Sequence, residues 1–208
     1  MLIIQVLSQV ATRTTSLADG CTLLWSHPQV MAELREVITI LGAKRSHLTQ
    51  PLRIRLTVPL HIHASYARSE ILAAFGLGEG AQEVAWREGV RWVANEQTDV
   101  FLVTADKTSG QFSPTTRYRD HAINRTRFHW ESQSRTTADS PTGRRYQTHE
   151  AAGTHIVLFA RHRQDDRAFL CLGPASYVRH ESERPMQVTW RMHVPIPADA
   201  MGWLAMAA

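Results

Sequence analysis

The chain has 208 residues, of which 43% are apolar and 20% are charged, and its formal net charge at pH 7 is +4. These values are ordinary for a globular protein, and no run of residues approaches the roughly 18 apolar positions that a membrane-spanning helix needs. Only two cysteines, Cys21 and Cys171, are present, and residues 1–7 lack the basic start of a secretory signal, so we expect a cytoplasmic protein without disulfides or membrane contact.

Residues 27–42 predict an amphipathic helix. Ser26 can cap its start and Gly42 can end it. We interpret residues 1–50 as an N-terminal helical appendage to a domain of residues 51–208. The expected buried face of the helix consists of Val30, Met31, Leu34, Val37, Ile38 and Leu41.

The domain reads as an irregular mixture of strands and short helices. Because the two kinds of element do not alternate as βαβ units, we expect an α+β fold: a curved mixed sheet or pseudo-barrel of about six or seven strands with two or three short helices. The predicted strands are residues 52–63, 89–93, 99–104, 127–133, 154–161, 167–172 and 187–194, and the predicted helices are residues 66–75 and 140–152.

Arginine is concentrated in one segment. From Arg117 to Arg145 there are seven arginines, no lysines and three acids, which gives this segment a net charge of +4. A guanidinium group binds phosphate through two parallel hydrogen bonds and also stacks on flat rings, so arginines mixed with aromatic residues indicate a nucleic-acid surface.

The predicted helix of residues 140–152 starts with Ser140 as its N-cap, and free backbone amides at such a start attract anions. Its two arginines either contact phosphate with the help of these amides or are solvated surface residues. The predicted phosphate-binding residues are Arg117, Arg119, Arg135, Ser140, Thr142, Arg144 and Arg145.

The predicted strand of residues 127–133 has one aromatic and one polar face. Its aromatic residues either belong to the core or line a pocket in which a planar base stacks. A nearby carboxylate could then accept a hydrogen bond from an exocyclic amine of the base. The predicted pocket residues are Tyr118, Asp120, Phe128, Trp130, Glu131 and Tyr146.

Eleven histidines raise the alternative of a metal-dependent nuclease built on Asp120 and His121. None of them shows the His-Glu-x-x-His spacing of a helical zinc site, so we expect no metal and no other cofactor. Cys171 lies in an apolar run, where a thiol behaves as a small hydrophobic group.

Several ungapped motifs resemble the family catalogued as domain of unknown function 3427, and the resemblance covers about residues 55–200. The motifs occur in the order found in that family. They are residues 59–76, 112–123, 128–134, 139–146, 169–177 and 184–190.

The resemblance implies a function that composition and spacing do not. In that family the domain usually follows a phospholipase-D-type nuclease and a superfamily 2 helicase in restriction systems that attack modified DNA. Residues 1–50 resemble the linker after the helicase, but this chain contains neither enzyme. The resemblance therefore implies a non-catalytic reader of double-stranded DNA that carries 5-methylcytosine or 5-hydroxymethylcytosine. It also implies a defence role, a helicase or nuclease partner, and a fold like the SRA and PUA-like group.

Two further alternatives remain at this point. The recognised mark could be a phosphorothioate backbone, because sulfur recognition also needs a basic and apolar cleft. The chain could instead be an interaction module that docks onto a helicase or nuclease through the apolar stripe of residues 27–42.

Overall fold

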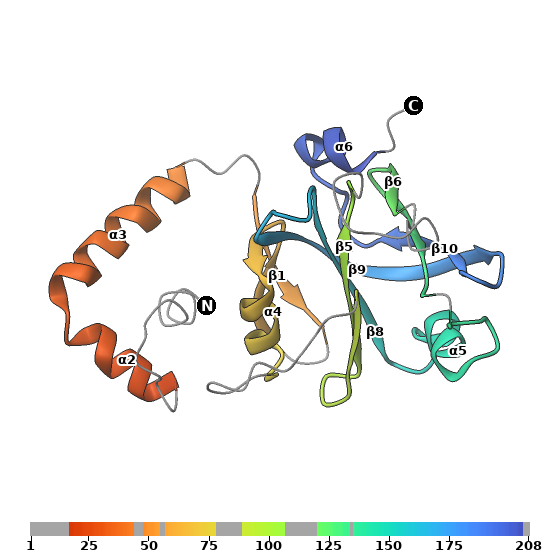
Figure 1. The fold of residues 1–208 in the computed structure, drawn as a ribbon, viewed down its shortest axis with the longest axis horizontal. Coiled ribbons are helices and arrows are strands. Elements are labelled where there is room, and N and C mark those ends of the chain that lie inside the picture. The colour runs from red at the N-terminus through yellow and green to blue at the C-terminus, as the bar shows by residue number, and fades with distance from the viewer. Residues whose placement is uncertain are drawn as a thin grey trace.

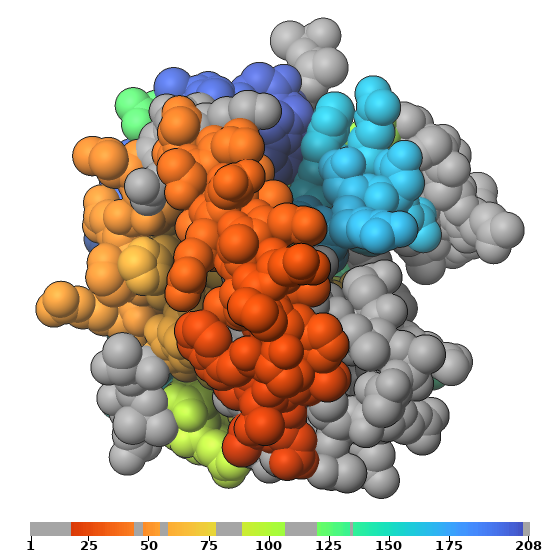
Figure 2. Space-filling model, turned by 90° about the vertical axis from the view of Figure 1, so that its left-hand side faces the viewer, coloured from red at the N-terminus to blue at the C-terminus, as the bar shows by residue number. Residues whose placement is uncertain are grey.

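The computed structural model describes residues 17–43, 48–54, 57–77, 89–106, 120–133 and 135–205. Within this part of the chain, two helices stand beside an α+β domain (Figure 1). They are α2 (Leu17–Trp25) and α3 (Pro28–Ala43). In Figure 2 they form a continuous band across the side of the molecule that faces the viewer. No helix among the described residues is long and apolar enough to cross a membrane.

The predicted helix of residues 27–42 is confirmed by α3 to within one residue at each end. Two details of the prediction are wrong. The Ser26 hydroxyl does not cap α3 but donates to the Leu23 carbonyl of the preceding helix, at 2.6 Å. The apolar stripe of α3 is not buried: Val37 is 46% exposed and Leu41 is 60% exposed, because the described residues leave this face open.

The domain is built on an open eight-stranded mixed sheet, which confirms the predicted α+β class and excludes a closed barrel. Its order is β4-β5-β8-β9-β10-β7-β6, with β3 paired to β9, and β5 pairs with β8 in parallel. The strands are β3 (Ser65–Ala67), β4 (Val90–Val93), β5 (Thr98–Thr104), β6 (His121–Asn124), β7 (Arg127–Glu131), β8 (His155–Arg161), β9 (Ala168–Glu181) and β10 (Gln187–Met192).

Two hydrophobic clusters cover the two faces of this sheet. On β5 and β8, successive residues point alternately into one cluster and the other, as strand geometry requires. The aromatic cluster contains Phe101, Phe128, Trp130, Tyr146 and Trp190, and α5 (Pro141–Thr148) and α6 (Ala198–Leu204) pack into it. The aliphatic cluster on the opposite face consists mainly of leucine, isoleucine and valine, together with three phenylalanines, and it is covered by α4 (Arg68–Ala74) and a separate hairpin of β1 (Gln50–Arg53) and β2 (Thr57–Ile62).

Strand β9 differs most from expectation. The predicted strand of residues 167–172 stops before Gly173 and Pro174, but β9 runs for 14 residues and continues to Glu181. The pairing of β8 and β9 shifts register between Leu158 and Phe159, and Gly173 lies beside this shift with a φ of 92°. The glycine is therefore part of a bulge that bends the strand rather than ending it.

The start of α5 agrees with the prediction. The Ser140 hydroxyl accepts the N–H of Gly143 at 3.1 Å, and Pro141 occupies the first turn. Gly143 packs directly on the Thr137 carbonyl, so that an added Cβ would overlap with this oxygen. The helix ends at Thr148, four residues earlier than expected.

This contact predicts that Gly143→Ala lowers the free energy of unfolding by about 1–3 kcal/mol, because the loop before α5 must move to admit a methyl group. Gly202→Ala in α6 is the matched control, since a Cβ there meets nothing within 4 Å. The control should be neutral or up to about 1 kcal/mol more stable. Urea denaturation measures both variants, and equal changes would contradict the packing.

Candidate nucleic-acid interface

The aromatic residues predicted to line a base pocket lie in the core instead. Phe128, Trp130 and Tyr146 are 0%, 5% and 2% exposed. The Trp130 ring lies 4.4 Å from Phe101 and 5.6 Å from Tyr146 between centroids, and burial raises the pKa of the Tyr146 hydroxyl. These three residues are thus wrong as pocket candidates, because their rings pack against one another. Tyr118 lies outside the described residues.

The two predicted pocket carboxylates lie together at the end of β7. Asp120 is buried, and its Oδ1 accepts the backbone N–H of Glu131 at 2.9 Å. The Glu131 side chain is 10% exposed, and its Oε1 lies 3.8 Å from Nε2 of His129. Asp120 thus holds the backbone of β7 beside Glu131.

Arg145, predicted to bind phosphate, is paired inside the protein. Its Nε and Nη2 donate to the two carboxylate oxygens of Asp99 at 2.7 and 2.8 Å. The Asp99 side chain is fully buried, and the Arg145 guanidinium also lies 4.3 Å from the centroid of the Trp92 ring. Its hydrogen bonds to Asp99 raise the pKa of Arg145. Arg145 is thus held against Asp99 inside the protein, which gives the phosphate prediction for this residue no support.

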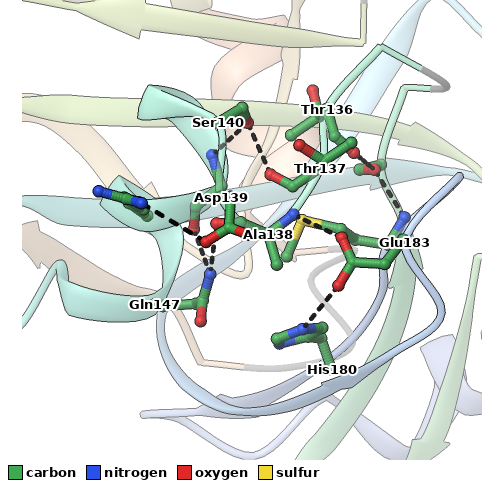
Figure 3. Close-up of polar contacts among 12 residues, drawn as sticks. Thr136, Thr137, Ala138, Asp139, Ser140, Gln147, His180 and Glu183 are labelled. Atoms are coloured by element: carbon green, nitrogen blue, oxygen red, sulfur yellow. Dashed lines mark hydrogen bonds and ion pairs between the residues drawn. The ribbon is translucent and has the colours of Figure 1, made fainter.

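The loop before α5 is fixed to the turn between β9 and β10 (Figure 3). Oε2 of Glu183 accepts the N–H of Ala138 at 3.0 Å, and Gln147 of α5 donates to the Ala138 carbonyl at 2.9 Å. The Ser140 hydroxyl donates to the Thr137 carbonyl at 2.6 Å while it caps the helix. Ser140 therefore has a structural role at the helix start.

The other predicted phosphate contacts are more open. The Arg144 side chain is 70% exposed and lies 3.5 Å from Asp139 in an exposed ion pair that solvent screens strongly. Arg135 is exposed and Thr142 is half-buried. Arg117 and Arg119 lie outside the described residues. Of the predicted arginines that the structure describes, only Arg135 and Arg144 remain available at the surface near α5.

A second set of polar residues lies on the face of the sheet opposite the aromatic cluster. In β7 and β10 every second residue is buried, so the residues between them point to the other side. The aliphatic cluster does not extend over these strands. The polar face, as we name it, consists of His121 on β6, Arg127, His129 and Glu131 on β7, Gln187, Thr189 and Arg191 on β10, and Ser176, Arg179 and Glu181 on β9.

The strand register places these residues in rows. Arg191 lies directly opposite Arg127 on one side and Ser176 on the other. The next row joins His129, Thr189 and Arg179 in the same way. Residues directly opposite on one face have Cβ atoms roughly 4.5–5.5 Å apart, so the exposed side chains of each row can contact one ligand, while Ser176 is fully buried.

Sequence reasoning identified the polar side of β7 but missed Arg179 and Arg191. Arg179 lies beyond the predicted strand of residues 167–172, because β9 is longer than the sequence indicated. The signal for Arg191 was present, since polar residues occupy every second position from Gln187. Nothing local, however, indicates that β10 pairs with β7, since even Gln187 and Glu131 lie 56 positions apart in the sequence.

The charge of the polar face is mixed. Arg179 and Glu181 form an exposed ion pair of 3.3 Å, which contributes little to stability. The His121 and His129 rings lie 4.9 Å apart between centroids. Burial, with the charge of His121 as a second cause, lowers the pKa of His129, which therefore favours its neutral form.

One edge of the polar face carries a tight hydrogen-bonded cluster. The Ser176 hydroxyl donates to Oε1 of Glu150 at 2.5 Å and lies 2.8 Å from Nε2 of His193. The hydrogen bond from the Ser176 hydroxyl is the main cause that lowers the pKa of Glu150. Within the described ranges, no group of three or more histidine, cysteine or carboxylate side chains has the arrangement to hold a metal ion.

A family model with the description "Domain of unknown function (DUF3427)" matches residues 60–203, which is more than half of the chain. The match includes the whole polar face and excludes α2 and α3. No curated protein matches the chain.

Proposed function

The chain belongs to the domain of unknown function 3427 family, and on this basis and that of its polar face we propose that it is a non-catalytic module that binds double-stranded DNA. We propose further that it reads a modified base, 5-methylcytosine or 5-hydroxymethylcytosine, within a cytoplasmic restriction or defence system. A helicase or nuclease would then supply the enzymatic activity. The resemblance of the sequence motifs supports these finer points.

One observation carries the DNA-binding proposal: three arginines occupy neighbouring strands on one side of the sheet, where the hairpin and α4 do not cover it. Arg127 and Arg191 are cross-strand neighbours, and Arg179 lies in the adjacent row. Guanidinium groups on such a surface can bind phosphates of a duplex, while Thr189 and Gln187 offer hydrogen bonds to base edges. The exposed Arg144 and Arg135 would extend the contact beyond the sheet.

A preference for a modified base needs more than the added methyl group. One buried methyl is worth about 0.8 kcal/mol, which corresponds to only a few-fold in affinity. Extruding a base from the duplex costs a few kcal/mol, which stacking and hydrogen bonds must offset. Strong discrimination would therefore require a shaped site that holds the modified base and excludes water.

A fluorescence titration tests the proposal on four duplexes of the same sequence: unmodified, 5-methylcytosine, 5-hydroxymethylcytosine and phosphorothioate. We expect binding that weakens steeply with salt and favours a base-modified duplex. The double variant Arg179→Gln/Arg191→Gln should bind at least about tenfold more weakly, with a salt slope lower by about two. The control Arg35→Gln/Arg53→Gln, which removes two charges from exposed residues of α3 and β1 outside the polar face, should bind like the wild type.

Three results of this titration would count against the proposal. If the wild type bound no duplex at low salt, DNA binding itself would be wrong. If Arg179→Gln/Arg191→Gln bound as well as the control Arg35→Gln/Arg53→Gln, the polar face would not be the interface. Equal affinity for all four duplexes would remove the modified base from the proposal, and preference for the phosphorothioate duplex would transfer recognition to the backbone.

A further inference from the structure

Two half-buried arginines lie over the same aromatic ring, at the opposite end of β9 from Arg179. The guanidinium carbon of Arg161 lies 4.7 Å from the centroid of the Phe169 ring, and that of Arg68 lies 5.9 Å from it. Phe169 and Arg179 are ten residues apart on β9, which corresponds to about 30 Å of extended strand. This pair of arginines is thus separate from the polar face.

The fold brings these residues together from three elements. Arg161 is the last residue of β8, which pairs with β9, and Arg68 is the first residue of α4. Strand β3 places α4 there, because Tyr66 lies opposite Phe169 in the pairing of β3 with β9. Both arginines are therefore positioned by backbone pairing, and neither depends on the chance placement of a surface loop.

The Arg161 guanidinium is held in a fixed orientation. Its Nε donates to the Thr104 hydroxyl at 3.0 Å, and its Nη1 donates to the Asp166 carbonyl at 2.9 Å. Among the described residues, these bonds use two of the five N–H groups of the guanidinium. The remaining N–H groups can bind an anion without any change in the side chain's position.

Two positive charges near one ring are unfavourable unless an anion offsets them. Burial lowers the pKa of both arginines, and the charge of Arg68 lowers that of Arg161 further. Asp165 and Asp166 act on Arg161 in the opposite direction. Because a guanidinium stays charged in proteins, an anion bound beside the two groups would interact favourably with both charges.

We propose that Arg68 and Arg161 form a binding site for a phosphate group, with the Phe169 ring as the apolar surface against which both guanidinium groups are held. Guanidinium favours phosphate because its N–H groups match two phosphate oxygens at once. The phosphate belongs either to the backbone of a nucleic acid or to a free phosphate-bearing molecule. The site rests on its own geometry, and it does not depend on the proposed DNA reader.

The test uses the full chain and two probes, sodium phosphate and sodium pyrophosphate, at an ionic strength held constant with sodium chloride. Binding is followed by nuclear magnetic resonance of the arginine Nε–H groups and by the thermal midpoint. We expect the Arg161 signal to shift with phosphate, and Arg68→Gln to raise the apparent Kd about tenfold or more. The matched control is Arg167→Gln, which removes the same charge from an exposed residue just before β9.

Arg161→Gln is a second variant. It also removes the hydrogen bonds to Thr104 and Asp166, so it can disturb the fold as well as the site. Its fold is therefore compared with the wild type in chloride before phosphate is added. The proposal is overturned if phosphate shifts neither the Arg161 signal nor the midpoint beyond chloride. It is equally overturned if Arg68→Gln binds both probes as Arg167→Gln does.

A parallel titration with a short unmodified duplex distinguishes the two sources of phosphate. If Arg68→Gln weakens duplex binding as it weakens pyrophosphate binding, the site takes a backbone phosphate. If duplex binding is unchanged while pyrophosphate binding falls, the site takes a free phosphate-bearing molecule. A wild type that binds phosphate but no duplex contradicts the DNA-binding proposal and leaves this site supported.

Discussion

Arg145→Ala should lower the free energy of unfolding by about 3–5 kcal/mol, because it leaves a buried carboxylate without its partner. The Asp99 side chain is fully buried, and both of its oxygens accept hydrogen bonds from Arg145. The variant also removes the guanidinium from its place over Trp92. Urea denaturation of the purified chain measures the loss directly.

The neighbouring residue supplies the control. Arg144 lies on the same helix but has a side chain that is 70% exposed, so Arg144→Ala should change stability by no more than about 0.5 kcal/mol. The double variant Asp99→Asn/Arg145→Met should be more stable than Arg145→Ala alone, because no unpaired charge stays buried. If Arg144→Ala and Arg145→Ala were equally stable, the pairing of Arg145 with Asp99 would be refuted.

His149→Ala should lower the free energy of unfolding by about 2–4 kcal/mol and should weaken its dependence on pH. His149 is 3% exposed, and its Nε2 accepts the N–H of Tyr177 at 3.1 Å. Its Nδ1 lies 3.3 Å from the Thr154 carbonyl, to which it can donate only as the Nδ1–H tautomer. The neutral ring thus ties the end of α5 to β9, and the variant leaves two backbone groups without this partner.

The direction of the pH effect follows from the pKa. Burial is the main cause that lowers the pKa of His149 below its usual value, and the nearby His193 and His155 lower it further. The unfolded chain therefore takes up a proton near pH 6.5, while the folded chain resists it. Stability that is present above about pH 6.5 is lost as the pH falls towards the lower pKa of the folded state. The pKa of His129 is lowered too, so it contributes in the same direction.

Denaturation at about pH 7.5, 6.5 and 5.5 measures this effect. The wild type should lose stability over this range, and His149→Ala should lose less. His27→Ala, an exposed residue between α2 and α3, should retain the wild-type dependence. The wild type could prove equally stable at all three pH values, or His149→Ala could leave the pH dependence of stability unchanged. Either result would show that the buried neutral ring of His149 does not control the pH dependence of stability.

The arginine-rich segment that first indicated a nucleic-acid surface does not act as one unit. Arg145 is directed into the protein, Arg144 and Arg135 lie at the surface near α5, and Arg127 lies on the polar face. The DNA-binding proposal consequently rests on a different set of arginines from the one that suggested it. Two of them, Arg179 and Arg191, come from strands outside that segment.

The sequence by itself determined those features that depend on residues a few positions apart. The helix of α3, the cap of α5 at Ser140 and the alternation of β7 were predicted correctly, because periodicity and capping are local. The motifs also identified the family, which the match over residues 60–203 confirms.

Only the tertiary structure decided which polar residues face a ligand and which face the core. Arg144 and Arg145 are adjacent in the sequence, but only Arg145 meets a buried carboxylate, and that carboxylate lies 46 positions away. The side of β7 that carries Trp130 became core because β5 and β10 supply Phe101 and Trp190 to the same cluster. Such outcomes depend on the pairing of distant strands, which local sequence does not specify.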